Sequence, residues 1–541
     1  MAGLPDQAGT DCRRSWKSVT AEDQEGTTAD TAGRRVRGLA ARSRALITLL
    51  DENRVLSLAV AVTASMYLVA TFFNRIPAYA MVFYALAAVG WACAFMDRRA
   101  AVVLLACIPV LDTYAVGYQF TLPLASVTGA AFHLGAARRK IGGLSGLDLG
   151  VAGFALATIV SVPLAVDQHV SLVAATRIAA LVVTYFFLSR AMLEPRTNRL
   201  ACLAFAAAGT WCALVAIGQF LVPVFPVPLL GRYTIEGGML RVVGFASNAN
   251  TLGVTLVLSA LVCTEQALRP SLTMRTAGWT LCASISALGI ALTLSRGAYV
   301  GLAVGVVVLV VLKGIPRRAL AIMGVALVAL IIVAAAAGAA TRAASVVNFT
   351  SDSSSMDRIY LSKVSMRMFN THVAQGVGIS GFGAAYPQFA DPRVVVTPVL
   401  EGHQMFFSIP AETGLLGLLA ELVIGCSLVV ALFRVRRRLR ATELATVGLA
   451  ASLGYAAMSF FNTLQIMSPL WLALAWAGAL MLDTGTLCVV QRADRQPVPA
   501  ASHLASSVPY TISTTDRPSS LSPTRWVPPS PSEAEGTHRR S

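Results

Sequence analysis

Two apolar runs meet at a charged turn in the stretch "LGIALTLSRGAYVGLAVGVVVLVVLK", residues 288–313, and this stretch decides the fold class. The turn is very short and contains Arg296. A helix that spans a bilayer needs about 20 apolar residues, and the runs Ala277–Leu294 and Ala298–Leu312 approach that length. The stretch therefore predicts two membrane-spanning helices joined by a tight turn that carries a charge.

The whole chain has the same character. Of its 541 residues, 56% are hydrophobic and 13% are charged, and the mean hydropathy is +0.67. Soluble domains carry about 25% charged residues, so this composition excludes a set of soluble domains as well as a disordered chain. We predict an all-α, polytopic transmembrane helix bundle with about 12–14 spans, the lower number applying if the element near Asp112 is broken. The candidate spans are Val55–Phe73, Pro77–Met96, Ala100–Tyr114, Phe120–Ala136, Leu149–Val166, Val170–Leu188, Leu200–Val222, Asn248–Leu268, Ala277–Leu294, Ala298–Leu312, Ala319–Ala340, Met405–Phe433, Glu443–Phe461 and Ile466–Leu482.

Much of the net charge of +16 comes from basic residues in loops that lie on one side of the membrane. Alternate short loops are rich in arginine and lysine, up to the run "RVRRRLR" at 434–440, and they fall on the side of the basic amino-terminal tail. Cytoplasmic loops of membrane proteins carry such an excess. We therefore expect a bacterial cytoplasmic (inner) membrane protein with both termini in the cytoplasm. Nucleic acid, which a basic soluble chain would suggest, is not expected as a partner.

Composition also divides the chain into three parts. Residues 1–54 and 483–541 are polar and are expected to be disordered cytoplasmic tails, and residues 55–482 form the membrane body. Two exterior segments are long, 223–247 and 341–403. The second holds six aromatic residues, which a disordered linker would not, so we expect it to fold against the membrane body.

Three arginines lie in or near the outer ends of predicted spans: Arg177, Arg241 and Arg296. Charges in such places are costly and often functional, although any one of them is also explained by snorkelling to the interface. Arg241 precedes Asn248 and Asn250, which fit a capped helix start. Because a guanidinium binds phosphate oxygens in a fork, two arginines on one side predict a site for a diphosphate.

His403 ends the long exterior segment, immediately before the span that begins at Met405. A histidine there can act as a general base near neutral pH, and the alternative is an ordinary polar residue at the interface. Exterior carboxylates are sparse, and the nine cysteines show no CxxC spacing. We therefore expect no metal site, no disulfide framework and no cofactor.

Four segments together resemble the O-antigen ligase and polymerase family, in their order, side and spacing. They cover roughly residues 240–420, and one departure from the family pattern is Gln404, where the family often has asparagine. The segments are "RVVGFASNANTLG" (241–253), "LTLSRGAYVG" (292–301), "GVGISGFGAAY" (376–386) and "GHQMFFSIPAETGLLG" (402–417).

The resemblance implies a metal-independent, inverting glycosyltransferase that moves a glycan from a polyprenyl diphosphate lipid to a glycan, lipid or protein acceptor. It implies that Arg241 and Arg296 bind the diphosphate and that His403 deprotonates the acceptor. Arg177 is a weaker candidate for donor contact, and Arg358 and Arg367 are possible sugar contacts. The alternative is a secondary transporter or lipid-linked glycan flippase, favoured by Asp112 and by the depth of Arg177.

Overall fold

The computed structural model describes residues 54–72, 77–111, 129–134, 143–222, 233–236, 239–246, 248–268, 274–313, 353–394, 401–435 and 446–484. The chain divides into two compact units, 1–492 and 493–541. All the described residues belong to the first unit. The second unit, nearly all of both predicted tails, the span expected at 319–340 and Asp112 lie outside them.

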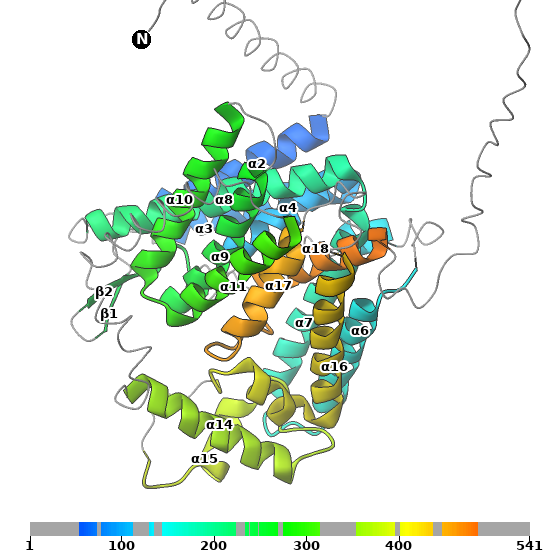
Figure 1. Ribbon diagram of the computed structural model, residues 1–541, viewed down its shortest axis with the longest axis vertical. Helices are drawn as coiled ribbons and strands as arrows, with labels where there is room; N and C mark the ends of the chain where they lie inside the picture. The colour runs from blue at the N-terminus through cyan, green and yellow to red at the C-terminus, as the bar shows by residue number, and fades with distance from the viewer. Residues whose placement is uncertain are drawn as a thin grey trace, which may run out of the picture. The chain divides into compact units, whose positions relative to one another are not determined.

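The membrane body is built from apolar helices at the positions predicted from hydropathy (Figure 1). Among the described residues, five helices are long and apolar enough to cross a membrane, namely α7, α8, α10, α11 and α16, and shorter apolar helices accompany them. The prediction of an all-α polytopic bundle is confirmed. The bounds are α2 Arg54–Phe72, α3 Pro77–Met96, α4 Arg98–Leu111, α6 Gly146–Ser161, α7 Gln168–Ala191, α8 Pro195–Leu221, α9 Ala249–Ala267, α10 Met274–Thr293, α11 Arg296–Lys313, α16 Met405–Val435, α17 Val447–Met458 and α18 Ser468–Thr484.

Polar residues mark where several of these helices begin. Asp167 caps α7 by accepting from the backbone N–H of Val170 at 3.0 Å. Asn248 caps α9 by accepting from Thr251 N–H at 2.9 Å, so the predicted helix start after Arg241 is confirmed. A cap of this kind satisfies one of the amides that the first turn leaves free, which matters most where lipid cannot supply a partner.

Glycines on one face of α11 allow it to pack closely against α17. Gly301 lies one turn after Gly297, and a Cβ at Gly301 would come within 3.3 Å of the carbonyl oxygen of Gly454 in α17. Small residues spaced four apart let two membrane helices approach until their backbones touch. This contact fixes the position of the first turn of α11, which begins with Arg296.

The helix α16 is interrupted at Gly414, which the hydropathy of the segment does not reveal. Gly414 has φ 67° and ψ −157°, a conformation that only glycine adopts readily. The carbonyl groups of Ala411 and Glu412, which precede the break, accept from the N–H groups of Val377 and Gly378, both at 2.9 Å. The break is thus paired with the loop that follows α14.

The described part of the segment 341–403 contains two helices and the loop between them. It forms α14 (Ser353–Thr371) and α15 (Phe382–Phe389), and both pack against α16, as Figure 1 shows. Between them lies a small core of Leu361, Val364, Met368, Val377, Phe382, Ala385 and Ala411. The other long segment contributes a two-stranded antiparallel hairpin, β1 (Tyr233–Glu236) and β2 (Met239–Val242), which an all-helical prediction did not include.

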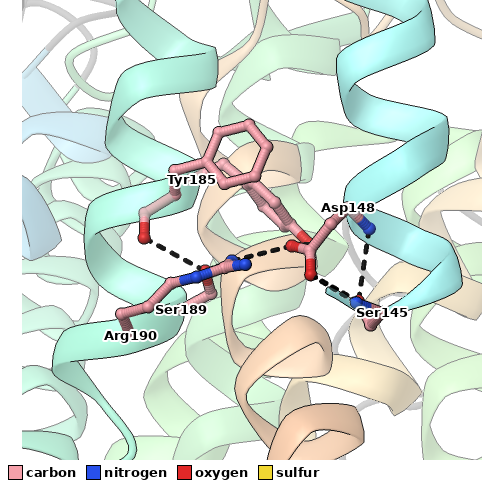
Figure 2. Close-up of polar contacts among 6 residues, drawn as sticks. Ser145, Asp148, Tyr185, Ser189 and Arg190 are labelled. Atoms are coloured by element: carbon pink, nitrogen blue, oxygen red, sulfur yellow. Dashed lines mark hydrogen bonds and ion pairs between the residues drawn. The ribbon is translucent and has the colours of Figure 1, made fainter. Parts of the chain in front are cut away.

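Two basic residues, one in the last turn of α7 and one at the end of α11, bind buried carboxylates. The side chain of Asp148 in α6 is fully buried, and its Oδ1 accepts from Arg190 Nη1 at 2.7 Å (Figure 2) and from the Tyr185 hydroxyl at 2.8 Å. Glu265 of α9, equally buried, accepts from Lys313 Nζ at 2.6 Å. These ion pairs therefore join α6 to α7 and α9 to α11.

Candidate functional site

Arg241 lies on β2, and its guanidinium reaches the ends of two helices. It is 8% exposed. Its Nε donates to the carbonyl oxygen of Thr293, the last residue of α10, at 3.0 Å, and its Nη2 donates to Oδ1 of Asn250, in the first turn of α9, at 3.1 Å. The guanidinium is therefore fixed where β2, α9 and α10 meet.

Arg296 follows Thr293 by three residues and begins α11. It is also 8% exposed. In the turn between α10 and α11, Leu294 has φ 53°, and the N–H of Ser295 donates to Oγ1 of Thr293 at 3.2 Å. Thr293 thus interacts both with Arg241 and with the turn that carries Arg296. Two arginines taken from separate motifs are brought to the same end of α10.

His403 lies just before α16, and the two residues that follow it are held by neighbouring elements. It has φ 55°, in the left-handed region, and its side chain is 43% exposed. On one side, Oε1 of Gln404 accepts from the hydroxyl of Ser362 in α14. The N–H of Met405 then donates to the carbonyl of Ser459 at 2.9 Å and to that of Asn462 at 3.3 Å. The imidazole is therefore accessible while its backbone is fixed.

The turn between α17 and α18 connects the histidine to the arginine turn. Gly297, next to Arg296, is so close to this turn that a Cβ would come 2.7 Å from Nδ2 of Asn462. The carbonyl of Asn462 accepts from Met405, two residues after His403. Beside this turn, the guanidinium carbon of Arg358 lies 6.0 Å from the ring centre of Phe461, a cation–π distance. Arg241, Arg296 and His403, distant in the sequence, therefore border one region.

Arg177 is half-buried on α7. The beginning of α7 reaches the segment after α14, because Val166 N–H donates to the carbonyl of Val377 at 3.0 Å and Gly378 packs against Ala165 and Ser171. Arg177 lies farther along α7, which packs against α18. The contacts described above, which join the surroundings of Arg241, Arg296 and His403, do not include Arg177. Arg367, the other possible sugar contact on α14, is exposed and donates to the carbonyl of Phe389 at 3.1 Å.

Two further polar side chains, Glu412 and Tyr386, lie buried or partly buried in the elements around this region. Glu412 is 2% exposed and accepts from the N–H of Ser380 at 3.0 Å and from Nε2 of Gln465 at 3.4 Å, so it ties α16 to two loops. In the loop core, burial raises the pKa of the Tyr386 hydroxyl, and the nearby Tyr360 and Asp357 act in the same direction. The Tyr386 hydroxyl therefore stays protonated and uncharged at neutral pH.

Several residues of this region were not singled out from the sequence. Asn462 and Thr463 lie in the α17–α18 turn, and Ser362 lies in the middle of α14. Little in the sequence distinguishes them, because polar residues are common in short connections between spans and on helices outside the membrane. Glu401 is one of the sparse exterior carboxylates and was not assigned a role, yet its Oε1 lies 3.3 Å from Nδ1 of His403. The spacing of two residues could have suggested this pair.

Metal ligands do not gather in the part of the chain that the structure describes. No three histidine, cysteine, aspartate or glutamate side chains come together there as a metal ion would require. The cysteines among the described residues are all free, and most are buried in the helices. Independence from metal remains a prediction.

Part of the sequence that forms this region also matches a known protein family. Residues 281–422 match the family model described as O-Antigen ligase. This part of the chain is similar to O-antigen ligases. No curated protein matches the chain. The predicted resemblance is confirmed over residues 281–422, which contain three of the four motifs, and with it the class of an integral bacterial membrane protein of glycan transfer.

The O-antigen ligase segment contains two of the four predicted site residues, Arg296 and His403, and ends within α16. Arg241, on β2, and Arg177, on α7, lie before it. The segment therefore includes the arginine turn, the helices α14 and α15 and the break in α16. Two other elements that border the candidate site, β2 and the α17–α18 turn, lie outside the matched residues.

Proposed function

We propose that this protein transfers a glycan from a polyprenyl diphosphate lipid to an acceptor hydroxyl at the outer side of the bacterial cytoplasmic membrane. Arg241 and Arg296 hold the diphosphate, and His403 accepts the proton of the acceptor hydroxyl. Arg177 is proposed as a weaker donor contact. The reaction needs no metal ion or other cofactor, because the arginines supply the positive charge.

One observation carries the proposal. Arg241 donates to Thr293, three residues before Arg296, and Gly297 packs against Asn462, which accepts from Met405 beside His403. Two cations and a histidine thus border one region although they come from β2, α11 and the segment before α16. Phosphate oxygens suit a pair of guanidinium groups, and an accessible imidazole beside them suits a hydroxyl that must lose its proton.

The chemistry that follows is a displacement at the anomeric carbon of the sugar. The acceptor oxygen forms a bond with that carbon, and the bond from the carbon to the diphosphate oxygen breaks with its electron pair leaving on the diphosphate. The acceptor proton moves to His403. Negative charge develops on the leaving diphosphate, so cations that are already in place stabilise the transition state more than the bound donor.

The test uses purified protein, a polyprenyl diphosphate-linked glycan and a set of glycan, lipid and protein acceptors. We expect Arg241→Ala, Arg296→Ala and His403→Ala each to lower the transfer rate by about 100-fold or more, since single electrostatic or base groups typically contribute that much. Arg196→Ala, at an exposed position in the first turn of α8, is the matched control and should keep the wild-type rate. Equal transfer by all the variants would contradict the proposal.

A transporter or flippase for the lipid-linked glycan is the second candidate, and the break in α16 is the observation that favours it. Transporters place interrupted helices and ionisable groups at their substrate sites, and Gly414 interrupts α16 next to the buried Glu412. The two functions are separated in reconstituted vesicles. Movement of unmodified lipid-linked glycan across the bilayer, with no transfer to any acceptor, would favour the transporter.

A further inference from the structure

Glu401 lies beside His403 and is itself held by a third residue. Its Oε1 is 3.3 Å from Nδ1 of His403, and its Oε2 accepts from the hydroxyl of Thr463 in the α17–α18 turn. Thr463 is 2% exposed, whereas the side chains of Glu401 and His403 are 39% and 43% exposed. The carboxylate is therefore bound on its inner side to a buried hydroxyl and faces the imidazole with its other oxygen.

The backbone makes this arrangement specific. His403 has φ 55°, which is uncommon for a residue other than glycine and persists only where the surroundings enforce it. Gly402 before it is buried, and a Cβ there would come 2.3 Å from the hydroxyl of Ser408. Gln404 and Met405 after it are bonded to α14 and to the α17–α18 turn. The chain is thus held in the one bend that brings residues 401 and 403 together.

The contact also selects one nitrogen of the ring. A neutral imidazole carries its proton on one nitrogen and a lone pair on the other, and the partner of one nitrogen decides which is which. Since Nδ1 faces a carboxylate, Nδ1 is the nitrogen that carries the proton. The lone pair is then on Nε2, on the far side of the ring from Glu401. A histidine that must accept a proton needs this tautomer and a fixed ring.

We propose that Glu401 is a positioning residue for His403, and that Thr463 in turn positions Glu401. The inference rests on the proposed function, in which His403 takes the acceptor proton. In the transfer step, Nε2 accepts the proton of the acceptor hydroxyl as the acceptor oxygen bonds to the anomeric carbon and the diphosphate leaves with the electron pair. The ring becomes a cation, and Glu401 stabilises that cation at Nδ1 without taking its proton.

A simpler role, a solvated surface carboxylate, would leave Glu401 without fixed partners. Its bond to a buried threonine 62 positions away argues against that role. The matched example is Glu194, at the start of α8, which accepts from the hydroxyl of Thr197 at 2.9 Å. Glu194 has the same kind of partner, and no histidine contact is described for it. Comparing substitutions of Glu401 and Glu194 therefore separates the effect of the histidine contact from the effect of the hydrogen bond to threonine.

The experiment compares Glu401→Gln, Thr463→Val, His403→Ala and Glu194→Gln in the purified full-length protein with lipid-linked donor and acceptor. We expect Glu401→Gln to lower kcat by about 10- to 100-fold with little change in the KM for the donor, by analogy with residues that orient metal-bound histidines. Thr463→Val, which leaves both Glu401 and His403 in place, should show a smaller loss. Glu401→Asp should recover part of the rate because it restores the charge, and Glu194→Gln should match the wild type.

Thermal unfolding of each variant shows whether it is folded. Wild-type kcat in Glu401→Gln while His403→Ala is inactive would overturn the inference and leave the proposed function standing. An unchanged rate in His403→Ala would instead contradict the proposed function. Measurement of the residual rate gives a second criterion, because Glu401→Gln should add no further loss in the His403→Ala background. An equal loss in both backgrounds would show that Glu401 acts independently of the histidine.

Discussion

At the scale of single residues, two nearly buried arginines have defined partners. Arg241 donates from two different nitrogens to two different helices, and Arg190 binds the buried carboxylate of Asp148. A guanidinium can do this because its donors are fixed in a plane, whereas an ammonium is a single point charge. The identity of the cation therefore matters at these positions, beyond its charge.

The first prediction concerns Arg241→Lys. A lysine keeps the positive charge but cannot reach both Thr293 and Asn250 in the same geometry, so we expect a loss of about 10- to 100-fold in transfer from the lipid-linked donor, comparable to a charge-assisted hydrogen bond. The rate is measured with purified protein beside Arg196→Lys, which should be unaffected. A wild-type rate for Arg241→Lys would show that charge alone is sufficient at this position.

The second prediction concerns the ion pair in Figure 2. In Asp148→Ala the guanidinium of Arg190 is left without its carboxylate in a site where its side chain is 9% exposed. Removing one partner of a buried pair typically costs about 3–5 kcal/mol, so we expect a clearly lower thermal unfolding temperature in detergent. Glu194→Ala, at a partly exposed carboxylate, should change it little. Equal unfolding temperatures for the two variants would contradict a stabilising role for the pair.

At the scale of elements, the break in α16 is what joins the membrane helix to the helices α14 and α15. Because Gly414 leaves the helical conformation, the carbonyls of Ala411 and Glu412 are available to Val377 and Gly378. The N–H of Leu415, just after the break, donates to the carbonyl of Val373 at 2.7 Å. A continuous helix would use these groups internally and could not bind the loop.

The third prediction compares two glycines of α16. Gly414→Ala would place a Cβ 2.5 Å from the carbonyl oxygen of Ala374 at a φ of 67°, so we expect a loss of stability of about 1–3 kcal/mol or more. Gly425 has nothing within 4 Å of its Cβ position, so Gly425→Ala should be neutral or slightly stabilising. Thermal unfolding in detergent distinguishes them, and similar behaviour of the two would exclude a specific role for the break.

At the scale of the molecule, the candidate site and the segment 353–394 belong to the end of the bundle where α7 begins. Val166 and Ser171 contact residues 377 and 378 at that end, and α7 then continues to Ala191, close to the start of α8. With 24 residues, α7 is about 36 Å long, enough to cross the hydrocarbon core. If this end faces outward, as we propose, the start of α8 faces the cytoplasm.

The fourth prediction tests this sidedness by cysteine labelling in a variant whose nine native cysteines are replaced. A reagent that cannot cross the membrane, added outside intact cells, should label His169→Cys and Arg393→Cys. It should label Arg196→Cys only after the membrane is made permeable. All three positions are exposed. Labelling of Arg196→Cys alone in intact cells would reverse the proposed orientation.

Hydropathy predicted most helices to within a few residues because lipid imposes one requirement on every span, a run of apolar side chains of sufficient length. The prediction missed what hydropathy does not measure. It did not detect the hairpin of β1 and β2, and it treated α16 as continuous, since the break at Gly414 depends on a backbone angle and on partners near residue 377. It also did not connect Asp148 with Arg190.

By itself, the sequence determined three things. It showed that this is a polytopic helical membrane protein, it identified the charged residues beside the spans, and it revealed the resemblance to O-antigen ligases. These properties follow from local composition and short motifs. Only the tertiary structure decided that Thr293 interacts with Arg241, that Asn462 lies between Gly297 and Met405, and that Glu401 faces His403 while bound to Thr463. Except for the pair of Glu401 and His403, these contacts join residues from about fifty to more than a hundred positions apart, and helix packing, which local composition does not encode, brings them together.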